Sequence, residues 1–193
     1  MRRFALLGVR ANAVSVAAVL LSALAGVGLC VFINIPQCFL TLPVILFVRM
    51  GLNAADGMLA REHGQASALG VYLNELGDVV SDAFLLLPFA FVEGVSGLGV
   101  AVVALLVALS EMAGMLALTA GGARRYDGPL GKSDRAIVLG AVGLWIGCAG
   151  GLPPLIAASF APAMAVPLVF NTVVRVRRGI FPSGVERCGD VNS

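Results

Sequence analysis

The side chains best suited to chemistry lie in one stretch of the chain, from Asn53 to Asp82. Asn53 and Asp56 are three residues apart, whereas Asn74, Asp78 and Asp82 follow at intervals of four. In helices, such spacings put each set on one face, and a short loop makes the two helices antiparallel neighbours whose faces can converge. Carboxylate and amide oxygens suit Mg²⁺ or Mn²⁺, and no His/Cys set is present for zinc. The spacing therefore predicts a divalent-metal site between two neighbouring helices.

The helices that must hold these residues are predicted to span a membrane. Of the 193 residues 59% are hydrophobic and 12% are charged, whereas a soluble domain is about 25% charged. The predicted fold class is an all-α membrane protein with six transmembrane helices, at about residues 12–33, 37–60, 68–92, 98–119, 135–150 and 154–174. No polar linker divides the chain, so residues 1–178 are predicted to form one transmembrane domain, followed by a polar C-terminal tail at 179–193.

The positions of lysine and arginine predict which side of the membrane each loop occupies. With both termini in the cytoplasm, the basic residues of the loops and termini all lie inside. The loops left outside, at residues 34–36, 93–97 and 150–154, contain no Lys or Arg. The predicted metal site then lies at the cytoplasmic side of the second and third helices. The net charge of +2 is too small to indicate nucleic-acid binding.

The same stretch resembles the motif of the CDP-alcohol phosphatidyltransferase family. That motif has two Asp three apart, the second followed by Gly, then two residues and Ala-Arg; a Gly follows after eight residues, and two further Asp at intervals of four. At these spacings the chain has Asp56-Gly57, Ala60-Arg61, Gly70 and Asp78. It departs from the motif twice, with Asn53 and Asn74 at the first and third Asp positions. The resemblance extends from about residue 11 to about residue 174.

The resemblance implies an enzyme of phospholipid biosynthesis in the bacterial inner membrane. Its reaction would transfer a phosphatidyl group from CDP-diacylglycerol to an alcohol, with release of CMP and with Mg²⁺ or Mn²⁺ as cofactor. Members of the family are commonly homodimers, so a homodimer is also implied. The implied roles are general base for Asp78; metal ligand for Asn53, Asp56, Asn74 and Asp78; phosphate binding for Arg61; and nucleotide binding for Gly57, Ala60, Gly70, Asn12 and Ser15.

The two asparagines weaken the implied metal site. Each replaces a charged carboxylate by a neutral amide oxygen, so the site loses two negative charges and is expected to bind metal less tightly or to hold a single ion. Glu75 and Asp82 are candidate compensators, because Glu75 has a longer side chain and Asp82 lies on the same face as Asp78. A shifted register with Asp78 and Asp82 as the acidic pair is a second interpretation.

Other charged residues leave alternatives open. Arg49 is expected to pair with an acidic residue. Glu111, in the middle of the fourth helix, is costly to bury and is either a structural partner or a functional group. Lys132 and Arg135 are either positive-inside anchors or ligands for a phosphate on the acceptor alcohol, which the resemblance suggests.

Two other functions remain compatible with the sequence. The loss of two carboxylates suits a non-catalytic relative that binds CDP-lipid. A small transporter would instead use the intramembrane Arg49, Asp82 and Glu111 as a pathway, but it needs a second polar cluster near the outer side, where only Glu93 and Ser96 are found.

Overall fold

The computed structural model describes residues 10–62 and 64–181, and within these ranges it contains helices and no strand. The predicted all-α class is therefore confirmed for the described residues. The basic N-terminus with Arg2 and Arg3, and the predicted tail from residue 182 onward, lie outside them. The elements are α2 (Ala11–Val31), the 3-10 helix η1 (Pro36–Leu40), α3 (Thr41–Glu62), α4 (Ala68–Leu86), the 3-10 helix η2 (Leu87–Phe91), α5 (Gly97–Thr119), α6 (Lys132–Ala149) and α7 (Pro154–Ile180).

Local sequence explains several of the helix ends. The hydroxyls of Ser67 and Ser96 cap α4 and α5 by accepting hydrogen bonds from the third backbone N–H of each helix. Pro88 stands where α4 changes to η2, because proline has no N–H for the helix ladder and its ring clashes with the preceding turn. Pro154 begins α7, a position that suits its fixed φ.

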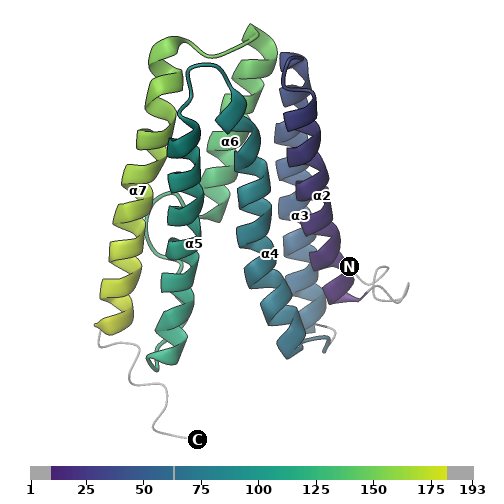
Figure 1. Ribbon diagram of the computed structural model, residues 1–193. Helices are drawn as coiled ribbons and strands as arrows, with labels where there is room; N and C mark the ends of the chain where they lie inside the picture. The colour runs from purple at the N-terminus through teal and green to yellow at the C-terminus, as the bar shows by residue number, and fades with distance from the viewer. Residues whose placement is uncertain (1–9, 63, 182–193) are drawn as a thin grey trace, which may run out of the picture.

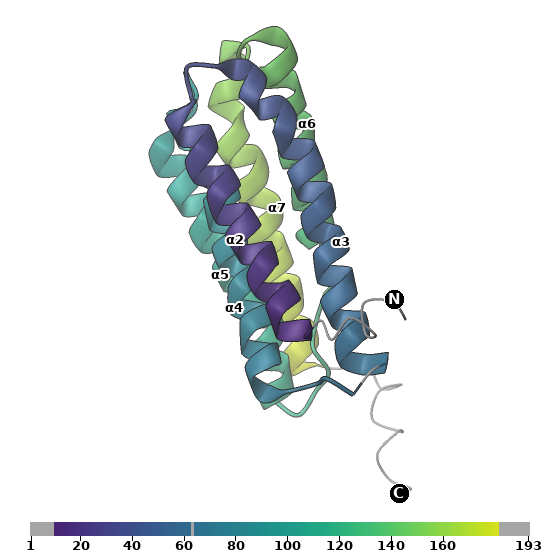
Figure 2. The same cartoon turned by 90° about the vertical axis from the view of Figure 1, so that its right-hand side faces the viewer.

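The long helices run along a common axis, with their connections alternating between its two ends (Figure 1). The helix α2 packs against α3 and α4, whereas α5 packs against α7. A view turned by 90° shows α3 and α6 side by side on one flank (Figure 2). The start of α2 and the end of α7 lie toward the same end of the bundle as the α3–α4 loop (Figure 1).

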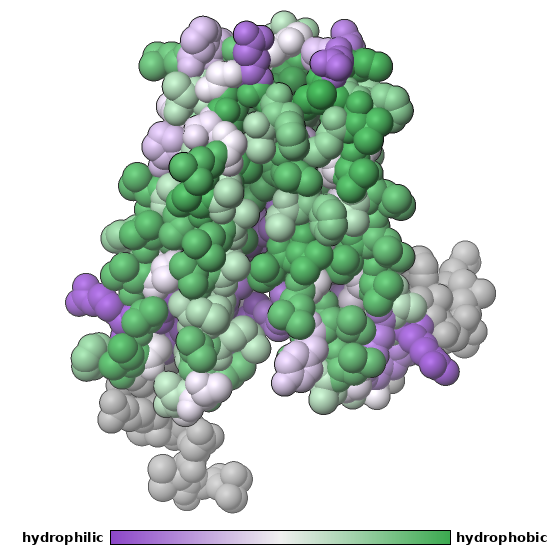
Figure 3. Space-filling view, in the orientation of Figure 1, coloured by the Kyte–Doolittle hydropathy of each residue, from purple (hydrophilic) through white to green (hydrophobic). Residues whose placement is uncertain are grey.

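The apolar core fills the half of the bundle near η1 and η2. There the ring of Phe89 stacks on Phe160 at 5.0 Å between centroids and meets Phe39 edge-on at 5.7 Å. The outer surface between the two ends is also largely apolar, whereas hydrophilic atoms are visible deep between the two halves of the lower part (Figure 3). Large exposed side chains such as Leu24, Phe47 and Leu155 suit contact with lipid.

Four segments are long and apolar enough to cross a membrane by length and composition: Ala11–Val31, Pro36–Glu62, Gly97–Thr119 and Pro154–Ile180. The other two long helices, α4 and α6, carry three charged residues each. The last helix continues six residues beyond the predicted end at residue 174. The prediction placed Arg175 after the last helix, on the cytoplasmic side, but it lies within α7 and is buried inside the bundle.

Candidate active site

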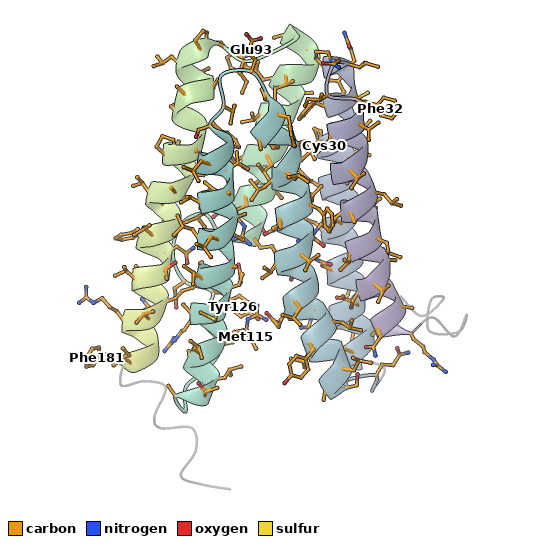
Figure 4. All side chains as sticks on the ribbon, viewed as in Figure 1. Cys30, Phe32, Glu93, Met115, Tyr126 and Phe181 are labelled. Carbon is orange, nitrogen blue, oxygen red and sulfur yellow. The ribbon has the colours of Figure 1, made fainter. Side chains whose placement is uncertain are left out.

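Two adjoining cavities lie in the half of the bundle away from the aromatic core. The first, of about 290 Å³, is lined by residues of α2, α3, α4 and α5, among them Met115; the second, of about 450 Å³, is lined by residues that include Tyr126. Both of these side chains are found in the lower half of the bundle, opposite Glu93 (Figure 4). Asn74 and Arg124 line both cavities, so the two spaces meet at these residues.

The first cavity contains Asp56, which α3 directs toward α2. The carboxyl group is only 5% exposed, and its Oδ2 accepts a hydrogen bond of 2.6 Å from the hydroxyl of Ser15. Because this hydroxyl is neutral, the negative charge of Asp56 has no ion-pair partner among the residues that the structure describes. Asp56 therefore gives the first cavity a negative charge that a bound cation can neutralise.

Small residues give the first cavity its room. Gly57, Ala60 and Gly70 all line it, as the family resemblance implies for nucleotide-binding residues. A Cβ added to Gly70 would lie 2.8 Å from Oδ1 of Asn12, so glycine is needed for this approach of α4 to α2. Arg61 is exposed, with its guanidinium close to Gly57, and it does not itself line either cavity.

The carboxyl group of Asp78, in α4, borders the second cavity and is surrounded by donors. Its Oδ1 accepts a hydrogen bond of 2.9 Å from Nδ2 of Asn53 and lies 3.4 Å from Nη2 of Arg49. Its Oδ2 accepts from the ammonium group of Lys132. The predicted convergence of the α3 and α4 faces is thus observed at Asn53 and Asp78, and the expected pairing of Arg49 with an acidic residue is confirmed.

The connection between α5 and α6 brings Lys132 to this point by folding back into the bundle (Figure 1). The backbone N–H of Arg125 donates to the carbonyl of Gly114, inside α5, at 3.1 Å. Gly128, with φ of 101°, packs so closely on α7 that an added Cβ would lie 2.9 Å from Cα of Asn171. Because the loop returns along α5 and α7, α6 begins beside Asp78 rather than at the end of the bundle.

Asp82, one turn beyond Asp78 in α4, is fixed between two guanidinium groups. Its Oδ1 lies 2.5 Å from Nη1 of Arg49, and its Oδ2 accepts from Nη2 and Nε of Arg135 at 2.7 and 2.9 Å. Arg135 is 2% exposed and also donates to Glu111 at 3.0 Å. These contacts make Asp82 and Arg135 parts of a buried ion-pair network that joins α3, α4, α5 and α6.

Glu111 lies at the centre of three arginines. Besides Arg135, it accepts from Nη1 of Arg175 at 3.2 Å and lies 3.8 Å from Nη2 of Arg124. Arg124 in turn pairs with Glu75 and stacks on the ring of Tyr126, at 4.6 Å from its centroid. The network thus reaches the junction of the two cavities.

Sequence reasoning identified part of this site and missed part of it. It singled out the α3 and α4 residues and Lys132, and the cavities bring these together. It treated Arg124 and Arg175 only as positive-inside residues, although both line the second cavity. The one available signal was Glu111, a carboxylate inside an apolar helix that requires buried cations.

Three side chains of the motif have oxygen atoms that could bind a cation: Asp56 in the first cavity, Asn53 in the second, and Asn74 where the two meet. Nδ2 of Asn74 donates to Glu75 at 3.3 Å and Nδ2 of Asn53 donates to Asp78, which leaves the carbonyl oxygen of each amide for a cation. Among residues 10–62 and 64–181, no group of three or more His, Cys, Asp or Glu side chains is arranged to hold a metal. One carboxylate with neutral oxygens suits a single ion that completes its shell with ligand oxygens.

The chain belongs to the CDP-alcohol phosphatidyltransferase family, whose model matches residues 9–174. The matched range includes the whole motif of α3 and α4, and the family is one of phosphatidyltransferases. The chain is 48% identical over 136 residues to "Inner membrane protein YnbA" of Escherichia coli (strain K12), an alignment that covers 70% of this chain and 67% of that protein. This similarity confirms the narrower resemblance to the YnbA-type subgroup that the paired asparagines and the segment Asp127–Ala136 predict.

Proposed function

We propose that the protein transfers a phosphatidyl group from CDP-diacylglycerol to an alcohol acceptor and releases CMP. The observation that carries this proposal is the meeting of two cavities at Asn74 and Arg124. A transferase of this type must hold a nucleotide-linked donor and an alcohol side by side. One cavity contains the small residues of the family motif, and the other contains Asp78, so the pair is suited to these two substrates.

The first cavity would bind the nucleotide part of the donor. Gly57, Ala60 and Gly70 leave space for it, and Arg61 and Arg124 would neutralise its phosphates. The family generally depends on divalent metal. Mg²⁺ or Mn²⁺ held by Asp56 with the amide oxygens of Asn53 and Asn74 would neutralise pyrophosphate charge at this place.

The second cavity would bind the acceptor alcohol. Asp78 would take the hydroxyl proton while the alcohol oxygen forms a bond to the lipid-linked phosphorus. The bond from that phosphorus to the oxygen of the CMP phosphate breaks, and CMP leaves with the electron pair. Lys132 and Arg175, whose side chains border this cavity, would bind an anionic group on the acceptor; Arg135 would position Asp82 and Glu111 rather than touch substrate.

The proposal includes six membrane-spanning helices and a site on the cytoplasmic side of the bacterial inner membrane. Support comes from the four apolar segments, from the basic residues at one end of the bundle and from the Escherichia coli relative, which is named an inner membrane protein. The helices α4 and α6 can cross as well, because Asp78, Asp82 and Arg135 have ion-pair partners inside the bundle. A homodimer would follow from the family resemblance.

The test is an acceptor screen with the purified protein in detergent. Mg²⁺ or Mn²⁺, CDP-diacylglycerol and a panel of alcohols with and without anionic groups are supplied, and CMP release and the mass of the lipid product are measured. We expect CMP and product lipid to appear together for at least one alcohol. Binding of CDP-diacylglycerol without CMP release across the panel would favour a non-catalytic lipid-binding relative instead.

A further inference from the structure

The charged side chains around the two cavities balance one another without any added cation. Asp134, which lines the second cavity, is exposed, and its carboxylate accepts from the backbone N–H of Gly131 at the start of its own helix. The remaining carboxylates and cations are equal in number, namely Asp56, Glu75, Asp78, Asp82 and Glu111 against Arg49, Arg124, Lys132, Arg135 and Arg175. The formal charge of these ten side chains is therefore zero.

The two amides are what makes this balance possible. Carboxylates in place of Asn53 and Asn74 would add two negative charges, and one additional divalent cation would be needed to balance them. Asn53 also makes a contact that a carboxylate cannot make, since its Nδ2 donates to Oδ1 of Asp78 at 2.9 Å. Two carboxylates at that distance would repel each other unless a cation or proton lay between them.

Lys132 occupies the place beside Asp78 where such a cation would be needed. Its ammonium group donates to Oδ2 of Asp78, while Arg49 and Asn53 contact Oδ1, so both carboxylate oxygens have donors from the chain. Asp56 is different, because its contact is with the neutral hydroxyl of Ser15. A position for a divalent ion is thus left on the Asp56 side of the site and not on the Asp78 side.

We infer that Lys132 is a built-in cation that takes the place of one divalent ion at Asp78, so that each chain binds a single divalent ion, near Asp56. The inference deepens the proposed function and rests on it for the nucleotide that completes the ion's oxygen shell. It makes the pair of asparagines and the lysine parts of one arrangement, in which lost carboxylates and a fixed positive charge compensate each other.

The test counts bound ions and does not need turnover. The purified full chain in detergent is titrated with Mn²⁺ at saturating CDP, and free Mn²⁺ is measured by electron paramagnetic resonance. We expect one bound ion per chain for the wild type and two for the variant N53D/N74D. Two ions or none in the wild type overturn the inference, as does a single ion in a folded N53D/N74D variant.

A second variant tests the role of the lysine itself. Lys132→Gln removes the positive charge that lies beside Asp78. A second Mn²⁺ is therefore expected to bind at Asp78, more weakly than the first ion binds near Asp56. Unchanged binding of one ion in this variant would contradict the role of Lys132 as the replacing cation. Failure of the acceptor screen alone would remove the transferase proposal, whereas the ion count of the CDP-bound protein would still decide this inference.

Discussion

Asp56 and Asp78 belong to one motif and lie on neighbouring helices, but their surroundings differ. Asp56 has a neutral hydroxyl as partner and lines a cavity of small residues. Asp78 has a lysine, an arginine and an amide around it. A carboxylate with a neutral partner keeps its charge available for an external cation, whereas one surrounded by donors is held in a fixed orientation. The comparison therefore assigns ion and nucleotide binding to the Asp56 side and proton transfer to the Asp78 side.

The strongest way to break this comparison is Asp78→Asn. The amide cannot accept a proton, so CMP release should fall by about 10²–10⁴-fold, the usual contribution of a general base. Binding of CDP, measured by calorimetry, should be retained because Asp78 does not border the first cavity. The control is Asp127→Asn, the same chemical change at a carboxylate that pairs with the exposed Arg178. Full activity of Asp78→Asn would refute the assignment.

A second large effect is expected on stability rather than on catalysis. Asp82→Asn leaves the buried guanidinium groups of Arg49 and Arg135 without their shared carboxylate, which costs about 3–5 kcal/mol for a buried pair. Thermal unfolding in detergent should show a much lower midpoint than for Asp78→Asn. The partner of Asp78, Lys132, is 34% exposed and can turn toward water. Equal midpoints for the two variants would show that the network does not stabilise the bundle.

A moderate effect on the Asp56 side should follow from Ser15→Ala. The change removes a hydrogen bond to a charged group, worth about 1.5–3 kcal/mol, so Mn²⁺ in the presence of CDP should bind at least about tenfold less tightly. We expect weaker binding, because the hydroxyl holds the carboxylate toward the cavity. Ser22→Ala is the matched control, since Ser22 donates to the carbonyl of Ala18 in its own helix.

The smallest effect is expected from Gly70→Ala. The new methyl group would lie 2.8 Å from Oδ1 of Asn12, so the Asn12 side chain must move and narrow the first cavity. The dissociation constant for CDP should rise by less than in Ser15→Ala. Gly28→Ala, on the α2 helix that also carries Asn12, has nothing within 4 Å of the new atom and should bind CDP like the wild type. Identical constants for both variants would remove Gly70 from the nucleotide site.

How far the sequence alone leads can be judged from particular residues. The pairing of Asn53 with Asp78 was predictable, because helical spacing and a short loop determine which faces meet. The position of Lys132 was not predictable, because it depends on a loop that is held against α5 and α7 by individual tertiary contacts, such as the hydrogen bond to the carbonyl of Gly114. Nor was the role of Arg135, whose two carboxylate partners lie 24 and 53 residues away. Periodicity describes a helix face, but long-range ion pairs depend on tertiary packing.

The position of Lys132 also has a practical consequence for chemical labelling. It is the only lysine in the chain, and its partly exposed ammonium group borders the second cavity. An amine-selective reagent would therefore modify Lys132 and the α-amino group of the chain, and no other side chain. A ligand in the cavity proposed for the acceptor should therefore slow the modification of this residue, so the rate of labelling would report on occupancy of that cavity without any engineered cysteine.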